Sequence, residues 1–242
     1  MLKRTRSLKS TAQRTLGTLA VALSATFGLS AQAALVSELG DAGQTQGTAQ
    51  VTTGNGGSIS SIFGSIASTT DADLFVIYIA NPAQFRATTD NAGTDAGLDT
   101  ELFLLTLAGA PVYLNDDDPS GTTLGSTLPN GDALGPQSAG LYILGISMSG
   151  YDPVNSNNQL LFANGLPTDL RGPAGGLQPS VLGGFDGGGF FDPGNYEIQL
   201  RGASFAVPEP GSAALVLLAG GALFGVSRRR TTQAKESNTA SA

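Results

Sequence analysis

The pattern of apolar and polar positions along the chain predicts a succession of β-strands. Two runs, Leu74 to Ile79 and Leu141 to Met148, consist mostly of apolar residues and are rich in isoleucine and aromatic side chains. Such runs are typical of strands that are buried on both faces. Residues Tyr196 to Arg201 instead alternate between apolar and polar positions. This alternation predicts a strand with one face toward the core and the other toward water.

Weaker patterns add further strands and loops. Glu101 to Leu107 and Val112 to Leu114 flank an Ala-Gly-Ala-Pro sequence, which predicts a β-hairpin. Short strands are expected at Ser58 to Ser68 and at Phe85 to Thr89. Segment 165–195 has ten glycines and four prolines without periodicity, so it is expected to form a long surface loop. Residues 34–206 show no helical period and are predicted to form one all-β domain, an antiparallel β-sandwich.

The C-terminal region has a different character, because Val207-Pro208-Glu209-Pro210 is followed by an apolar stretch and a basic cluster. Residues 211–227 contain only small, aliphatic, serine and phenylalanine side chains. A helix over this stretch would be roughly 25 Å long, which is just enough to span a bilayer. The basic cluster predicts a stop-transfer signal that leaves residues 231–242 as a cytoplasmic tail. It consists of Arg228, Arg229 and Arg230.

The order of these three parts, residues 207–230, resembles the PEP-CTERM sorting signal of Gram-negative bacteria. The resemblance implies recognition by an exosortase in the inner membrane and removal of the helix near the Pro-Glu-Pro sequence. It also implies delivery of residues 34–206 to the cell surface or to an exopolysaccharide matrix. The alternative is a single-pass anchor that is retained without cleavage.

The N-terminal residues 1–33 have the features of a signal peptide. Five basic residues lie between Lys3 and Arg14, and residues 16–29 are mostly apolar. Ala31-Gln32-Ala33 has the small-x-small form of a signal-peptidase site, which predicts cleavage after Ala33. The N-terminal segment predicts export, and the C-terminal segment predicts arrest in the membrane, so the two predictions agree.

Charge and composition restrict the chemistry of the region between the two ends. From Ala34 to Val207 there are seventeen acidic and three basic residues, so the region carries 3 − 17 = −14. This charge disfavours nucleic acid as a partner and favours cations. The chain has no histidine and no cysteine, and this region has no lysine. These absences exclude Ser-His-Asp and Cys-His catalysis, zinc sites built on imidazole or thiolate, and Schiff-base chemistry.

An acidic loop directly after the predicted hairpin is the candidate metal site. Asp116, Asp117 and Asp118 repel one another, and Ca²⁺ binds six to eight oxygen ligands of this kind. The position where an EF-hand has its bidentate glutamate is Thr127, so the loop is not an EF-hand. The alternative is a solvated turn whose aspartates accept hydrogen bonds from their own backbone. Carboxylates from other segments could complete a calcium site, and the candidates are Asp71, Asp73, Asp99 and Glu101.

A second resemblance concerns the central region. Five short sequences are similar in type and order to the pre-peptidase C-terminal-like domains of bacteria, which implies a jelly-roll-like sandwich with an accessory role. They are Asp71-x-Asp73-Leu74-Phe75, Phe85-x-Ala87-Thr88, Asp99 to Leu104, Asn115-Asp116-Asp117 and Ala139 to Leu144.

These observations predict an exported, non-catalytic protein of the cell surface or biofilm matrix. Signal peptidase and an exosortase would be its partners during export, with a transient stay in the inner membrane. The alternative is a carbohydrate-binding module for exopolysaccharide. A glycoside hydrolase built on two carboxylates is the third hypothesis.

Overall fold

The computed structural model describes residues 34–54, 57–175, 180–190 and 192–208. These residues form β-strands and one short 3₁₀ turn, η1 (Pro82–Gln84), so the prediction of an all-β fold is confirmed. No helix in the described ranges is both long and apolar enough to cross a membrane. The signal peptide, the apolar stretch 211–227, the arginine cluster and the tail all lie outside the described residues.

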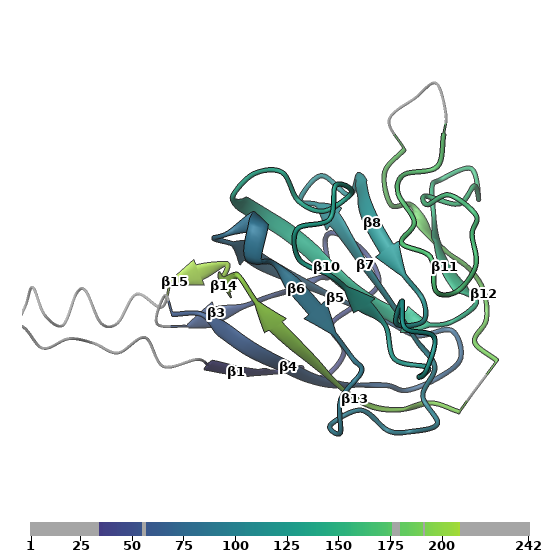
Figure 1. The fold of residues 1–242 in the computed structure, drawn as a ribbon, viewed down its shortest axis with the longest axis horizontal. Helices are drawn as coiled ribbons and strands as arrows, with labels where there is room; N and C mark the ends of the chain where they lie inside the picture. The colour runs from purple at the N-terminus through teal and green to yellow at the C-terminus, as the bar shows by residue number, and fades with distance from the viewer. Residues whose placement is uncertain (1–33, 55–56, 176–179, 191, 209–242) are drawn as a thin grey trace, which may run out of the picture. The chain divides into compact units, whose positions relative to one another are not determined.

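Most strands belong to two sheets (Figure 1). The five-stranded sheet has the order β1 (Ala34–Ser37), β4 (Ile59–Ile66), β13 (Gly194–Arg201), β6 (Arg86–Thr88) and β9 (Thr127–Leu128). The six-stranded sheet has the order β14 (Ala203–Phe205), β5 (Ala72–Ile79), β10 (Gly140–Met148), β7 (Thr100–Thr106) and β8 (Pro111–Asn115), with β2 (Gln50–Val51) also paired to β5.

Two small sheets complete the structure. One pairs β11 (Tyr151–Val154) with β12 (Gly184–Gly187), and the other pairs β3 (Thr53–Gly54) with β15 (Val207–Pro208). Strand β15 lies one residue beyond the predicted end of the domain at residue 206. The folded region therefore includes the first two residues of the Val-Pro-Glu-Pro sequence.

The prediction of a purely antiparallel sandwich is wrong in one respect, because the sheets are mixed. Three strand pairs run parallel, namely β1 with β4, β2 with β5 and β15 with β3. In each pair at least one strand is short, namely β1, β2, β3 or β15. These short strands lie toward the two ends of the described chain, where no tight turn fixes their direction. An alternating sequence has the same period in either direction, so it cannot distinguish a parallel partner from an antiparallel one.

The inner faces of the two large sheets share one hydrophobic core. Ile62 in β4 and Ile198 in β13 belong to the same buried cluster as Phe75 in β5 and Leu144 in β10. In β13, buried residues alternate with more exposed ones, as the sequence predicts. The apolar positions of this strand thus direct the five-stranded sheet toward its partner.

A second cluster covers the outer face of the six-stranded sheet. Leu74, Phe103 and Ile143 pack there against Leu161 and Leu182 from later segments. Strands β5, β7 and β10 are therefore buried on both faces, and for β5 the continuous apolar run Leu74 to Ile79 predicts this burial. Most of the described residues of the glycine-rich segment 165–195 are at the surface, but they also include β12 and part of this apolar cover.

Close packing within the six-stranded sheet depends on Gly145 in β10. Its register partner in β7 is Phe103, and a Cβ atom at position 145 would lie 2.1 Å from the Phe103 ring. The missing side chain leaves space for the aromatic ring, which packs on Phe162 and Phe185. The Phe103 ring therefore connects the six-stranded sheet to the apolar residues that cover its outer face.

Candidate metal centre

The hairpin of β7 and β8 places three carboxylates at one end of the six-stranded sheet. Asp99 directly precedes β7, and Asp116 and Asp117 directly follow β8. Leu102 pairs with Asn115 in antiparallel register, so the start of β7 lies beside the end of β8. The predicted hairpin is present and connects the two strands through residues 107–110.

Asp99, Asp116 and Asp117 form what we call the acidic cluster. Each contributes one carboxylate oxygen, and these three oxygens lie within 4.8 Å of one another. Asp99 is 5% exposed and Asp116 is 8% exposed. The Oδ1 atoms of all three residues are buried without a hydrogen-bond partner. Buried carboxylate oxygens are normally paired, so the cluster has acceptor capacity that the described protein groups do not use.

Ser149, directly after β10, fixes two members of the cluster relative to each other. Its hydroxyl donates to Asp116 Oδ2 at 3.2 Å. Its backbone N–H donates to the carbonyl oxygen of Asp99 at 3.1 Å. Because β10 and β8 lie on opposite sides of β7, the cluster is held by three neighbouring strands.

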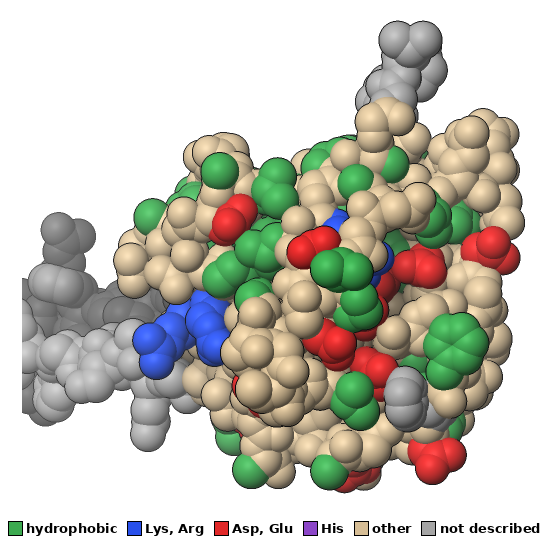
Figure 2. Space-filling view, turned by 45° about the vertical axis from the view of Figure 1, so that its right-hand side comes forward, with side chains coloured by type: hydrophobic (Ala, Val, Ile, Leu, Met, Phe, Trp, Pro, Cys, Tyr) green, Lys and Arg blue, Asp and Glu red, His purple; other side chains and the backbone are tan. Residues whose placement is uncertain are grey.

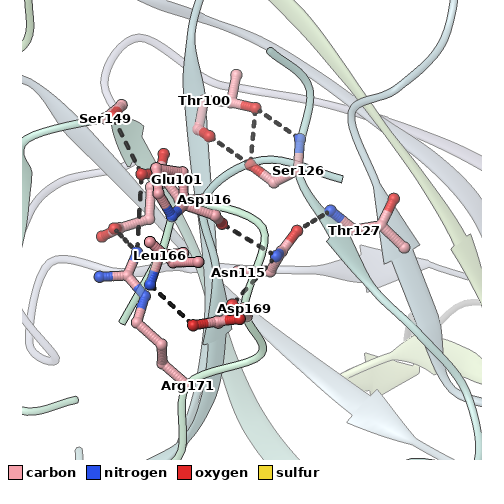
Figure 3. A network of polar contacts seen from close by, with 11 residues as sticks. Thr100, Glu101, Asn115, Asp116, Ser126, Thr127, Ser149, Leu166, Asp169 and Arg171 are labelled. Atoms are coloured by element: carbon pink, nitrogen blue, oxygen red, sulfur yellow. Dashed lines mark hydrogen bonds and ion pairs between the residues drawn. The ribbon is translucent and has the colours of Figure 1, made fainter. Parts of the chain in front are cut away.

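Arg171 places a positive charge next to the acidic cluster. Its guanidinium donates to Glu101 Oε2 at 3.0 Å and lies 3.8 Å from Asp116 Oδ2 (Figure 3). The backbone of Arg171 pairs with Leu114 through hydrogen bonds of 2.8 and 2.9 Å. The contacts of Arg171 with Glu101 and Asp116 are the ion pairs found among the described residues. One arginine therefore offsets part of the charge of two buried carboxylates.

Asn115 anchors the loop that carries the cluster. It is fully buried, its Oδ1 accepts from the Thr127 N–H at 2.7 Å, and its Nδ2 donates to the Asp169 carbonyl at 3.3 Å. Beside it, the Ser126 hydroxyl donates to the carbonyl of Thr100 (Figure 3). These bonds hold the cluster on a preorganised support, which is what a ligand site requires.

Burial dominates the electrostatics of these carboxylates. It raises the pKa of Asp99 to about 7, with Asp116 and Asp117 contributing repulsion. It also raises the pKa of Asp116 to about 6, although Ser149 and Arg171 act in the opposite direction. The pKa of Glu101 is raised well above its ordinary value, again because of burial. Negative charge here is costly unless a cation or a proton compensates for it.

The described part of the molecule is strongly acidic. Figure 2 shows several acidic side chains on one face, with basic side chains beside some of them. The described residues contain seventeen acidic and three basic side chains. A cation that approaches this face meets an attractive field.

Only some of the predicted site residues come together in the structure. Asp99, Asp116 and Asp117 come together, whereas Asp118 accepts a hydrogen bond from the Ser120 N–H at 2.9 Å within its own loop. Partial burial acts to raise the pKa of Asp118, but hydrogen bonds from Ser120 and Thr127 and the charge of Arg86 together outweigh it and lower the pKa.

Asp71 and Asp73 lie outside the acidic cluster. Asp71 Oδ2 accepts from the Ala67 N–H at 2.7 Å, and Asp73 belongs to a different group of carboxylates with Glu38 and Asp41. The sequence interpretation did not include Glu38, Asp41, Ser149 or Arg171. Arg171 could have been noticed as one of only three basic residues in a strongly acidic region.

The acidic cluster has the chemistry of a calcium ligand set. Ca²⁺ binds carboxylate, carbonyl and water oxygens at about 2.3–2.6 Å, so two ligand oxygens on one ion lie at most about 5 Å apart. The oxygens of Asp99, Asp116 and Asp117 satisfy this limit. Zinc usually selects imidazole or thiolate, and the chain contains neither.

The end of the described chain is attached to the body by backbone hydrogen bonds. The N–H of Ala206 donates to Thr52 Oγ1 at 3.0 Å, and the N–H of Val207 donates to the Thr52 carbonyl at 3.2 Å. Val207 pairs with Thr53 in β3. Residues 206–230 match the PEP-CTERM protein-sorting motif. The chain carries a C-terminal sorting signal.

This PEP-CTERM motif indicates an exported protein of Gram-negative bacteria that is targeted to an exosortase. The motif begins inside the folded region, at the residue before β15. Among curated proteins, none matches the chain. Several predicted processing residues lie outside the described residues, namely Ala31, Ala33, Glu209, Pro210, Arg228, Arg229 and Arg230.

Proposed function

We propose that the protein is an exported, non-catalytic component of the cell surface or of the extracellular matrix. The observation that carries this proposal is the PEP-CTERM motif, which starts at the residue before the last strand of the body, β15. The absence of histidine and cysteine from the chain supports a non-catalytic role, because most nucleophilic mechanisms need one of them.

The proposed processing has two steps. Signal peptidase removes residues 1–33, and the segment 211–227 then holds the protein in the inner membrane, with residues 231–242 in the cytoplasm. An exosortase next cleaves near the Pro-Glu-Pro sequence and releases residues 34–206 and the first part of the motif. Intact-mass analysis of protein from the cell surface tests this scheme. A C-terminus close to Pro208 is expected, whereas a C-terminus at Ala242 would mean a retained anchor.

We also propose that the acidic cluster binds Ca²⁺ and that the ion stabilises the body. The support is the set of buried, unpaired Oδ1 atoms of Asp99, Asp116 and Asp117, whose carboxylates converge within 4.8 Å. An ion bound to the folded state alone stabilises it by RT ln(1 + [L]/Kd), which is about 2.7 kcal/mol at one hundred times Kd. For a domain of this size the midpoint of thermal unfolding then rises by about 5–11 °C.

The calcium test uses the full chain in detergent micelles, with and without millimolar Ca²⁺. Asp99→Asn removes one negative charge from the cluster and should remove the part of the thermal shift that calcium at this cluster produces. Asp192→Asn is the matched control, because Asp192 is exposed and lies outside the cluster. An unchanged thermal midpoint of the wild-type protein in Ca²⁺, together with no heat of binding in calorimetry, would rule out the site.

The body is further proposed to be related to the pre-peptidase C-terminal-like domains. The five sequences that carry the resemblance lie on or beside β5, β6, β7, β8 and β10, and four of these strands form a continuous part of the six-stranded sheet. This continuity supports a shared jelly-roll-like core. An experimental structure with a different strand order would contradict the relationship.

Exopolysaccharide is a second candidate partner. A groove of about 690 Å³ runs between residues 89–98 and 122–125. Its lining includes hydroxyl, amide and carboxylate groups that can hydrogen-bond to sugars, among them Asp90, Asn91, Thr94, Asp95 and Thr122. A glycan array with one tight ligand would support this candidate. Release of new reducing ends from a polysaccharide would instead indicate a carboxylate-based glycoside hydrolase.

A further inference from the structure

A second group of carboxylates lies between the N-terminal segment and the two large sheets. Glu38 and Asp41 follow β1, and Asp73 is the second residue of β5. One carboxylate oxygen from each lies within 4.8 Å of the others. These residues come from parts of the chain that are more than thirty positions apart, so the group exists only in the folded protein.

Asp73 is the buried member of this group. Its exposed fraction is 0%. Oδ2 accepts a hydrogen bond from the Tyr196 hydroxyl at 2.8 Å, while Oδ1 is buried without a partner. The ion pairs of the described residues all involve Arg171, so no lysine or arginine there compensates for Asp73. A buried carboxylate with a free oxygen and no cation needs a further partner.

The absence of a side chain at Gly64 leaves space for the Tyr196 hydroxyl and the Glu38 carboxylate. Gly64 in β4 is the register partner of Tyr196 in β13. A Cβ atom at position 64 would lie 2.2 Å from the Tyr196 hydroxyl oxygen and 2.7 Å from Glu38 Oε2. A side chain there would displace both. Glycine therefore leaves room for the phenol and the Glu38 carboxylate beside Asp73.

Glu38 and Asp41 are held in position before any ligand arrives. Glu38 Oε1 accepts from the Ala42 N–H at 3.1 Å, and Oε2 accepts from the Ser65 N–H at 3.0 Å. Asp41 Oδ1 accepts from the Gly43 N–H at 2.7 Å. Each carboxylate oxygen has two lone pairs, so these bonds orient the groups and leave capacity for a metal ion.

We propose that Glu38, Asp41 and Asp73 form a second Ca²⁺ site, separate from the acidic cluster. The ion would connect the segment after β1 to the six-stranded sheet through Asp73. Water would complete its coordination, because Ca²⁺ takes six to eight oxygen ligands. Binding would fasten the first residues of the exported body. This site does not depend on whether the acidic cluster binds calcium.

A proton is the competitor for this site. Burial is the main cause that raises the pKa of Asp73 to about 8; the charges of Glu38 and Asp71 act in the same direction, and the hydrogen bond from Tyr196 acts in the opposite one. A calcium ion competes with a proton for this carboxylate, because a carboxylate must be deprotonated to bind a metal ion.

Calorimetric titration of the full chain in detergent micelles tests the inference through stoichiometry. The wild type should bind two equivalents of Ca²⁺. Asp73→Asn and Asp117→Asn should each bind one, and Asp192→Asn should bind two. Because Asp73 is buried, Asp41→Asn provides a variant at an exposed position. Asp41→Asn keeps the Oδ1 acceptor and should weaken calcium binding at the second site about tenfold, because the ligand loses its negative charge.

Terbium luminescence gives an independent readout. Tb³⁺ occupies calcium sites and is sensitised by nearby tyrosine, and the chain has no tryptophan. The hydroxyl of Tyr196 contacts Asp73, so bound Tb³⁺ should emit on tyrosine excitation. Tyr196→Phe should reduce this emission in the Asp117→Asn background, in which only the second site remains.

The outcomes separate the two calcium proposals. A single equivalent that is lost in Asp117→Asn and kept in Asp73→Asn would overturn the second site and leave the acidic cluster intact. A single equivalent lost in Asp73→Asn and kept in Asp117→Asn would support the second site and reject the first. Wild-type stoichiometry and affinity in both Asp73→Asn and Asp41→Asn would also overturn the inference.

Discussion

Replacement of Arg171 by methionine is the sharpest test of how the buried charges are balanced. Methionine keeps a long side chain but removes the guanidinium that donates to Glu101 at 3.0 Å. The Glu101 side chain is 1% exposed and that of Arg171 is 14% exposed. Removal of one partner from a buried ion pair costs about 3–5 kcal/mol, because the other charge stays buried and unpaired. The thermal midpoint should then fall by about 6–20 °C for a domain of this size.

The loss of stability caused by Arg171→Met should also depend on pH. Burial raises the pKa of Glu101 in the folded state, and loss of the positive charge of Arg171 raises it further. The folded variant then keeps a proton that the unfolded chain loses above about pH 4.3. Its stability therefore falls as pH rises from 5 to 8. The wild type changes less over this range, so the difference between the two proteins should be larger at pH 8.

Urea and thermal unfolding of the full chain in EDTA, followed by circular dichroism, measure these quantities without interference from calcium. The matched control adds Glu101→Gln to Arg171→Met. This double variant has no buried charge at position 101 and should be more stable than Arg171→Met alone by at least about 1 kcal/mol. A cost below about 1 kcal/mol for Arg171→Met, or an equal cost at pH 5 and pH 8, would refute the reasoning.

Three further predictions concern other positions. Burial raises the pKa of Asp99 to about 7, so calcium-free protein should lose stability between pH 5 and pH 8, and Asp99→Asn should flatten this dependence in urea titrations. Gly145→Ala should cost about 1–3 kcal/mol in urea unfolding because its Cβ overlaps Phe103; Gly140→Ala, with open space around it, should be neutral or slightly stabilising. Gly64→Ala should abolish binding of one calcium equivalent in calorimetry, and unchanged stoichiometry would contradict the role given to that glycine.

Much of the fold could be predicted because burial leaves a simple signature in the sequence. A run such as Leu74 to Ile79 fits a strand covered on both faces, and the structure covers β5 in this way. The alternation in β13 likewise identifies a strand with one wet face. The direction of β1, β2 and β15 could not be predicted, because each is short and its pairing depends on contacts with distant segments.

The candidate sites show the same division between local and distant information. Asp116 and Asp117 stand out as a local run of acidic residues, and the predicted hairpin brings Asp99 close to them. Arg171 reaches this region only through backbone pairing with Leu114. Glu38 meets Asp73 only after β1 and β5 have both formed. No periodicity or motif in the sequence encodes contacts of this kind.

The pairing of β15 with β3 attaches the start of the sorting motif to the folded body. Ala206 and Thr52, which hydrogen-bond at the start of the sorting motif, are 154 positions apart in the chain. These bonds join the start of the motif to a segment near the other end of the described chain. In the folded body the motif starts from a strand that is held in a small sheet, whereas in an unfolded body it would start from a flexible chain. The same short strand leaves the folded domain without a flexible stalk up to Pro208.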